Sequence, residues 1–106
     1  MQEQFFRYLA KFHPLDADAR QALVLACTVV HVPRNRDLQP IGHTCRTIYF
    51  INKGIARIYY FKNDTDITES FTSENQVVVR YESLFTGRPS RKAIQVLEDT
   101  ELVHID

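Results

Sequence analysis

The segment SLFTGRPSR, residues 83–91, carries the side chains in this sequence whose types and spacing best suit anion binding. Its side chains include the hydroxyl groups of Ser83 and Ser90 and the guanidinium groups of Arg88 and Arg91. Guanidinium groups and the backbone N–H groups at the start of a helix are common donors to phosphate oxygens. The segment therefore predicts either a phosphate-binding loop or an ordinary loop whose cations face solvent, and both interpretations stay open at this point.

Metal binding and nucleophilic catalysis receive little support from the sequence. The four histidines are scattered, and His43 with Cys45 is the only closely spaced pair of metal-ligand types. Two ligands fall short of the three or four that a zinc site needs. No serine or cysteine lies in a recognisable nucleophile motif with a histidine partner. We therefore expect no metal and no catalytic residue; a cupin-like metal enzyme, which would need a His-x-His pair, is a less favoured alternative.

The two cysteines are predicted to be free thiols. Cys27 lies among apolar residues and is expected to be a small buried side chain, whereas Cys45 lies in the polar stretch GHTCR. Disulfides are uncommon outside secreted proteins, and the N-terminus lacks the long apolar segment of a secretory signal. A disulfide between Cys27 and Cys45 is the alternative to two thiols.

Length and charge predict one domain with no global basic field. The chain has 106 residues, and its 13 Lys and Arg balance its 13 Asp and Glu. A chain of this size builds a single hydrophobic core. A neutral net charge does not favour nonspecific binding to nucleic acid or to an anionic membrane, and no apolar run is long enough to span a bilayer. We expect a cytoplasmic protein whose anion site, if it has one, is local.

The first thirty residues predict two short helices. Phe5, Phe6, Tyr8, Leu9 and Phe12 recur at helical spacing and give the first helix an aromatic face. After a break at Pro14, Asp16 is placed to cap a second helix. The predicted domain therefore divides into N-terminal helices over 1–30 and a β-roll over 31–106.

From Thr47 onward the sequence alternates with the period of β-strands. Gly54 predicts a tight hairpin between strands 47–51 and 55–61, because glycine adopts the positive φ that such turns need. Asn63 and Asp64 predict a second hairpin turn, since Asn and Asp favour turns. Residues 33–42 carry the turn and breaker signals Pro33, Asn35, Pro40 and Gly42. At least six strands after two helices predict a mainly β fold with flanking helices, a β-roll or jelly roll.

Three stretches carry a resemblance to a known family: FINKGIARIYYFKNDTDITESF, then YESLFTGRPSR, then KAIQVLEDTELVHID. This order resembles the sensor domain of the Crp/Fnr transcription regulators, within the cyclic-nucleotide-binding domain superfamily. The resemblance implies that residues 1–106 form one sensor domain with the β-roll fold of that superfamily. It also implies a short helix near residues 82–86.

The resemblance implies a site in a phosphate-binding cassette between two strands. In ligand-binding members a Gly-Glu-Leu motif begins a short helix, and an Arg further on pairs with the cyclic phosphate. Here Arg80, Tyr81 and Glu82 fall at the start of that motif, and the Arg position falls near Ser90 or Arg91. We therefore expect cyclic AMP and cyclic GMP to bind weakly or not at all. The site residues that the resemblance implies are Glu82, Ser83, Leu84, Ser90 and Arg91.

The resemblance also implies partners. A regulator of this family senses a small effector, here a cyclic nucleotide or another small anion, and binds DNA as a homodimer through a domain that follows the roll. That DNA-binding domain is expected to be absent from this chain, so we expect no DNA contact from the chain itself and none with a membrane. A genuine cyclic-nucleotide-binding domain is the alternative function. A protein-interaction module, suggested by the aromatic N-terminal helix, is less favoured.

Overall fold

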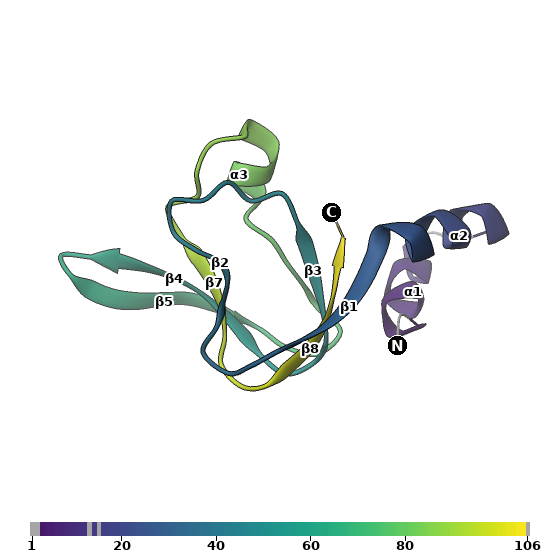
Figure 1. Cartoon of the computed structure of the whole chain (residues 1–106), viewed down its shortest axis with the longest axis horizontal. Coiled ribbons are helices and arrows are strands. Elements are labelled where there is room, and N and C mark those ends of the chain that lie inside the picture. Colours follow the sequence, from purple (N-terminus) through teal and green to yellow (C-terminus); the bar gives the residue numbers. More distant parts are fainter. Residues whose placement is uncertain (1–2, 13, 15, 106) are drawn as a thin grey trace.

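The computed structural model describes residues 3–12, 14 and 16–105. Positions 1, 2, 13, 15 and 106 of the predicted domain 1–106 lie outside the described residues. The described residues form three helices and eight strands (Figure 1). In chain order they are α1 (Glu3–Ala10), α2 (Ala17–Ala26), β1 (Cys27–Val32), β2 (Asp37–Gln39), β3 (Ile48–Lys53), β4 (Ala56–Lys62), β5 (Thr65–Thr72), β6 (Val77–Val78), α3 (Tyr81–Thr86), β7 (Ala93–Val96) and β8 (Thr100–Ile105).

The strands form two antiparallel four-stranded sheets. Their orders are β1-β8-β3-β6 and β2-β7-β4-β5, so the chain crosses repeatedly from one sheet to the other. Apolar side chains from both sheets meet in one core, because each strand turns its apolar face inward. The largest fully buried members of this core are Ile51, Ile94, Val96 and Leu102. The predicted mainly β roll with flanking helices is confirmed.

The predicted hairpin at Gly54 is wrong, although the two strands it joins exist. β3 pairs with β6 and β8, whereas β4 pairs with β5 and β7, so Gly54 lies where the chain passes from one sheet to the other. Its φ of 123° needs glycine, and a Cβ built there would lie 2.3 Å from Oγ1 of Thr100. The glycine therefore makes a crowded corner and not a hairpin turn.

The second predicted hairpin is confirmed. β4 and β5 pair antiparallel over seven residue pairs and project from the body of the roll (Figure 1). Asn63 and Asp64 at its tip have φ values of 52° and 64°. Two successive positive φ angles are typical of the tight turns that suit the twist of paired strands, and Asn and Asp tolerate them better than most residues.

The predicted boundary between helices and roll at residue 30 is wrong by several residues. β1 begins at Cys27, and its pairing with β8 runs from Cys27–Ile105 to Val32–Thr100. β-Branched residues in this stretch favour a strand once a partner strand is available. The end of α2 is therefore set by pairing with the last strand of the chain.

The strand β2 lies inside residues 33–42, the stretch in which the sequence showed turn and breaker signals. Asp37 pairs with Gln95 and Gln39 with Ile94, with an irregularity between the two pairs. Pro33 and Gly42 flank β2, and both residue types usually mark turns. A strand of only three residues, whose partner β7 lies far along the chain, leaves no clear alternation in the local sequence.

The aromatic face of α1 packs on the outside of the first sheet. Phe5 and Phe6 are buried, and the Phe5 ring centroid lies 5.1 Å from that of Phe50 in β3. Phe12, which follows the helix, is 74% exposed, so the predicted apolar face is buried only in part. As expected, Asp16 caps α2 by accepting a hydrogen bond from the backbone N–H of Ala19. Within the described part of the chain, no helix has the length and apolar character required to cross a membrane.

Candidate functional site

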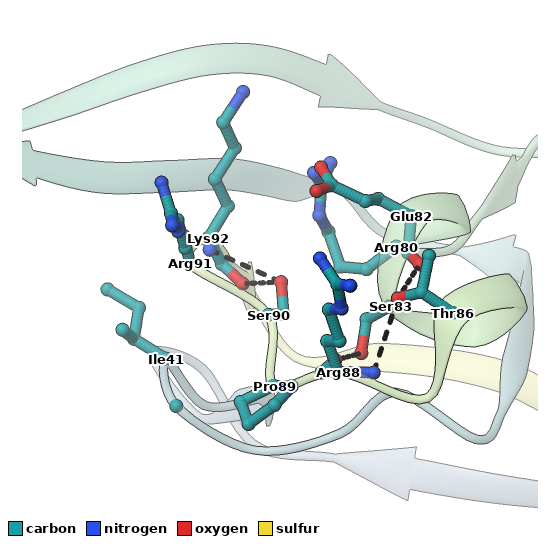
Figure 2. Close-up of a pocket in the computed structure, with 11 residues that line it drawn as sticks. Ile41, Arg80, Glu82, Ser83, Thr86, Arg88, Pro89, Ser90, Arg91 and Lys92 are labelled. Atoms are coloured by element: carbon teal, nitrogen blue, oxygen red, sulfur yellow. Dashed lines mark hydrogen bonds between the residues drawn. The ribbon is translucent and has the colours of Figure 1, made fainter.

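A pocket of about 600 Å³ lies between α3, the loop that leads from α3 to β7, and the loop that follows β2 (Figure 2). The predicted short helix near 82–86 is confirmed as α3, Tyr81–Thr86. Four cations line the pocket: Arg80, Arg88, Arg91 and Lys92. Glu82 contributes the single carboxylate to its lining. The wall is therefore strongly cationic although the chain as a whole is neutral.

Backbone hydrogen bonds hold the two loops together. The N–H of Gly42 donates to the carbonyl of Ser90 at 2.8 Å, and the N–H of Ser90 donates to the carbonyl of His43 at 2.9 Å. Gly87 ends α3 in the left-handed conformation, with φ 73° and its N–H donating to the carbonyl of Ser83. A glycine at this position is the usual way to end a helix and turn the chain. The pocket is thus framed by main chain, and its cationic side chains are not needed to close it.

Four of the five predicted site residues line this pocket: Glu82, Ser83, Ser90 and Arg91. Leu84 is not among the lining residues and is half-buried. Whether any of the five binds a ligand stays a prediction. Their convergence at one cavity does show that the segment singled out from the sequence supplies much of the pocket lining.

The two predicted serines serve the fold. Ser83 Oγ accepts a hydrogen bond from the backbone N–H of Cys45 at 2.7 Å and donates to the carbonyl of Arg88 at 2.6 Å. Ser90 Oγ donates to the carbonyl of Lys92 at 2.7 Å and accepts from the N–H of Lys92 at 3.2 Å. Both serines are buried. Their hydroxyls are committed to loop structure, which leaves the cations as the groups best placed to meet an anion.

Arg80, Arg88 and Lys92 line the pocket but were not among the predicted site residues. Arg80 and Lys92 lie at the two ends of the segment, next to strands, where an isolated cation is most simply interpreted as solvated. Lys92 directly follows Arg91 in the same cationic stretch, so the signal that drew attention to Arg91 could have found Lys92 as well. Arg80 was noted only at the start of the cassette motif, and no local signal points to its proximity to Glu69 on β5.

The four cations fall into two pairs. Arg88 and Arg91 are exposed, and neither side chain has a hydrogen bond or an ion pair to any of the described residues. Lys92 donates a hydrogen bond to Glu69 on β5, and Nη1 of Arg80 lies 3.9 Å from the same carboxylate. The hydrogen bond from Lys92 is the main reason that the pKa of Glu69 is lowered from its ordinary value. The pocket therefore has one pair of cations open to solvent and one pair already facing a carboxylate.

No cysteine or histidine is among the described residues that line this pocket. Cys27 and Cys45 are both free thiols, as predicted, and both are buried, although Cys45 lies in a polar stretch of the sequence. Burial raises the pKa of the Cys27 thiol, which keeps it protonated near neutral pH. Among the described residues, no three His, Cys, Asp or Glu side chains are grouped closely enough to hold a metal ion.

Solved structures are similar to this chain over nearly its whole length. The regulatory domain of PKA from Toxoplasma gondii with cAMP matches with a TM-score of 0.82 at 15% identity, covering 98% of this chain and 41% of the other. A cyclic nucleotide-binding domain from Methylobacillus flagellatus gives the same TM-score, identity and coverage of this chain, over 60% of its own length. This chain has the fold of cyclic-nucleotide-binding domains.

Regulator sensor domains share this cyclic-nucleotide-binding fold. The sensor domain of the transcriptional regulator DNR from Pseudomonas aeruginosa matches with a TM-score of 0.79 at 18% identity, covering 99% of this chain and 74% of the other. The predicted resemblance is thus confirmed at the level of the fold. No family model and no curated protein sequence matches the chain significantly.

The similar structures are regulatory and ligand-binding domains by their names. The chain spans only 41% and 60% of the first two. At these sequence identities the likeness shows the fold alone. What the pocket binds has to be inferred from the side chains that line it in this chain.

Proposed function

We propose that the chain is the effector-sensing domain of a Crp/Fnr-type transcription regulator and that its pocket binds a small anion. The observation that carries this proposal is the cationic wall formed by Arg80, Arg88, Arg91 and Lys92 in a chain of zero net charge. Exposed guanidinium groups beside a cavity pair well with phosphate and carboxylate oxygens, because their planar N–H donors match the spacing of those oxygens. The anion carries a phosphate or a carboxylate group and is smaller than a nucleotide.

Two features of the pocket favour an anion smaller than a cyclic nucleotide. The Arg80 side chain, which is 15% exposed, lines the pocket at the start of α3 (Figure 2), close to the place where the resemblance implies a glycine before the cassette carboxylate. A side chain there fills space that a ribose would need, since glycine is used where a ligand comes close to backbone. The hydroxyl of Ser90, near which the phosphate-pairing residue of the family falls, is bonded within its own loop.

A cyclic nucleotide is the second candidate. The likeness to a PKA regulatory domain named as bound to cAMP favours it, as does Glu82, a carboxylate in the pocket that could accept a hydrogen bond from a ribose hydroxyl. The two candidates differ in what they require of the pocket. A nucleotide needs the cavity as a whole, whereas a small anion needs only the cations.

Isothermal titration of the chain with inorganic phosphate, cyclic AMP and cyclic GMP tests the proposal. We expect phosphate to bind and Arg91→Ala to weaken it about ten- to hundredfold, the usual scale for hydrogen bonds to a charged group. Arg36→Ala is the matched control, because Arg36 is also exposed but belongs to the turn before β2 and is not a lining residue.

Three outcomes separate the candidates. Phosphate binding that depends on Arg91 while both nucleotides bind weakly supports the small anion. Micromolar nucleotide binding lost in Arg91→Ala restores the nucleotide sensor. Equal weakening by Arg36→Ala, or no binding at all, overturns the site.

The same proposal covers the whole protein. We infer that residues 1–106 are one sensor domain of a longer regulator, which binds DNA as a homodimer through another domain. The likeness to the sensor domain of a transcriptional regulator supports this.

A further inference from the structure

Glu69 on β5 places its carboxylate against two of the four pocket cations. Lys92 Nζ donates a hydrogen bond to one carboxylate oxygen. Nη1 of Arg80 lies 3.9 Å from the other oxygen. β5 belongs to the projecting hairpin, whereas Lys92 immediately precedes β7, so the contact joins two separate parts of the fold. In Figure 2 the Lys92 side chain extends from its loop toward the strands of that hairpin.

The Glu69 carboxylate is a chemical equivalent of the ligand that the pocket is proposed to bind. Carboxylates and phosphates accept hydrogen bonds from the same ammonium and guanidinium donors. The lowered pKa of Glu69 keeps this group ionised at neutral pH. Its side chain is 38% exposed, so water can replace its contacts when it moves away. A ligand that reaches Lys92 must therefore displace Glu69 or share the cation with it.

Arg80 has donor capacity that Glu69 does not use. The 3.9 Å separation is too long for a hydrogen bond, and Nε of Arg80 is buried with no hydrogen-bond partner among the described residues. Leaving a buried donor unpaired is costly, and such groups in native structures call for an explanation. An anion that entered beside Arg80 would supply the acceptor that Glu69 does not.

We propose that Glu69 is a tethered counter-anion that holds Lys92 and Arg80 in place when the pocket is empty and competes with the ligand for them. This inference rests on the proposed function, because it presumes that the pocket binds an anion. Glu69 then sets an affinity threshold. A weakly charged anion leaves Glu69 in place, and a phosphate displaces it, since a dianion gains more from the four cations than a single carboxylate does.

The structure also keeps Lys92 in position once Glu69 is removed. Its ammonium lies 5.3 Å from the ring centroid of Tyr60, within the range of a cation–π contact. Replacing the carboxylate should therefore free the ammonium for a ligand without disordering it.

The test measures the binding of inorganic phosphate to the chain and to its Glu69→Gln variant by isothermal titration. We expect Glu69→Gln to bind phosphate about two- to fivefold more tightly, the range for breaking a partly exposed ion pair. The control is Glu98→Gln, which removes the same charge from an exposed residue in the turn between β7 and β8. In a Lys92→Met background the gain from Glu69→Gln should shrink, because the shared cation is gone.

Tighter binding in Glu69→Gln alone supports the inference. Equal tightening by Glu98→Gln, or the same gain in the Lys92→Met background, would mean that net charge and not displacement is responsible, and would overturn it. If Glu69→Gln leaves phosphate affinity unchanged while Arg91→Ala still weakens it, the counter-anion role fails and the anion site stands. Failure of phosphate to bind either protein overturns both.

Discussion

At the end of the roll where β3 meets β4, the chain is held by steric contact, whereas at the end that carries α3 it is held by hydrogen bonds between loops. Gly54 packs so closely on Thr100 that a Cβ would lie 2.3 Å from its Oγ1 and 3.0 Å from its backbone Cα. Gly42 and Gly87 at the α3 end also have positive φ, yet nothing lies within 4 Å of a Cβ added to either.

This difference separates an end of the domain that contributes to stability from an end that is proposed to bind a ligand. The Gly54 end has no room for change, and close packing is intolerant of even one added carbon. The α3 end keeps its shape through main-chain bonds and the hydroxyls of Ser83 and Ser90, so the exposed cations Arg88 and Arg91 are not needed to hold it together. Substitutions at the two ends should therefore affect different properties.

The largest expected effect is at Gly54. We expect Gly54→Ala to lower the free energy of unfolding by about 3 kcal/mol or more, because it adds backbone strain and a clash with Thr100. Gly87→Ala adds strain alone and should cost about 1 kcal/mol. Urea unfolding of both variants and of the unchanged chain measures the two losses.

Equal losses at Gly54 and Gly87 would contradict the comparison, since they would show that φ alone matters and that the contact with Thr100 relaxes freely. A Gly54→Ala variant that unfolds already in buffer would strengthen it.

The sequence predicted those parts of the fold that depend on neighbouring residues. The β4–β5 hairpin follows from Asn63 and Asp64, whose turn preference is local. Gly54 was correctly marked as a positive-φ position, but a hairpin and a corner between sheets need the same backbone angle. What decides between them is the contact with Thr100, which lies far along the chain and leaves no local trace.

The candidate site shows the same limit. Glu82, Ser83, Ser90 and Arg91 were found because one segment carries them all. The pairing of Lys92 with a carboxylate on β5 could not be found this way, because no spacing within the segment refers to that strand. The sequence thus predicts which loop lines the pocket, but only the fold shows which of its cations pair with a carboxylate.

A smaller difference in stability is expected between substitutions of Arg57, which belongs to the fold, and of Arg91, which lines the pocket. Arg57 on β4 donates hydrogen bonds to both carboxylate oxygens of Asp66 at 2.7 and 2.8 Å, to Gln95 at 2.8 Å and to Thr68 at 2.8 Å. We expect Arg57→Met to lower the free energy of unfolding by about 2 kcal/mol, since these bonds link three strands. Arg91→Met should change it by less than about 0.5 kcal/mol. Urea unfolding of the two variants checks this; a comparable loss in both would place Arg91 in the fold and count against its role in binding.

The smallest expected effect is a pH dependence at Asp66. The hydrogen bond from Arg57, with the nearby guanidinium charge, lowers the pKa of this carboxyl below its ordinary value. The folded state therefore binds a proton at Asp66 less readily than the unfolded state does. The stabilisation is complete above the unfolded pKa of about 3.9 and is lost as the pH falls through the lowered pKa of the folded state. The difference in unfolding free energy between the unchanged chain and Asp66→Asn should thus be constant from pH 7 to pH 5 and shrink toward pH 3.

Because Glu69 is present in both proteins, its own titration cancels from the difference. A difference that stayed constant down to pH 3 would show that the Arg57–Asp66 pair does not contribute as an ion pair, and would leave the packing of Arg57 over the Tyr59 ring, 4.1 Å from its centroid, to account for its role.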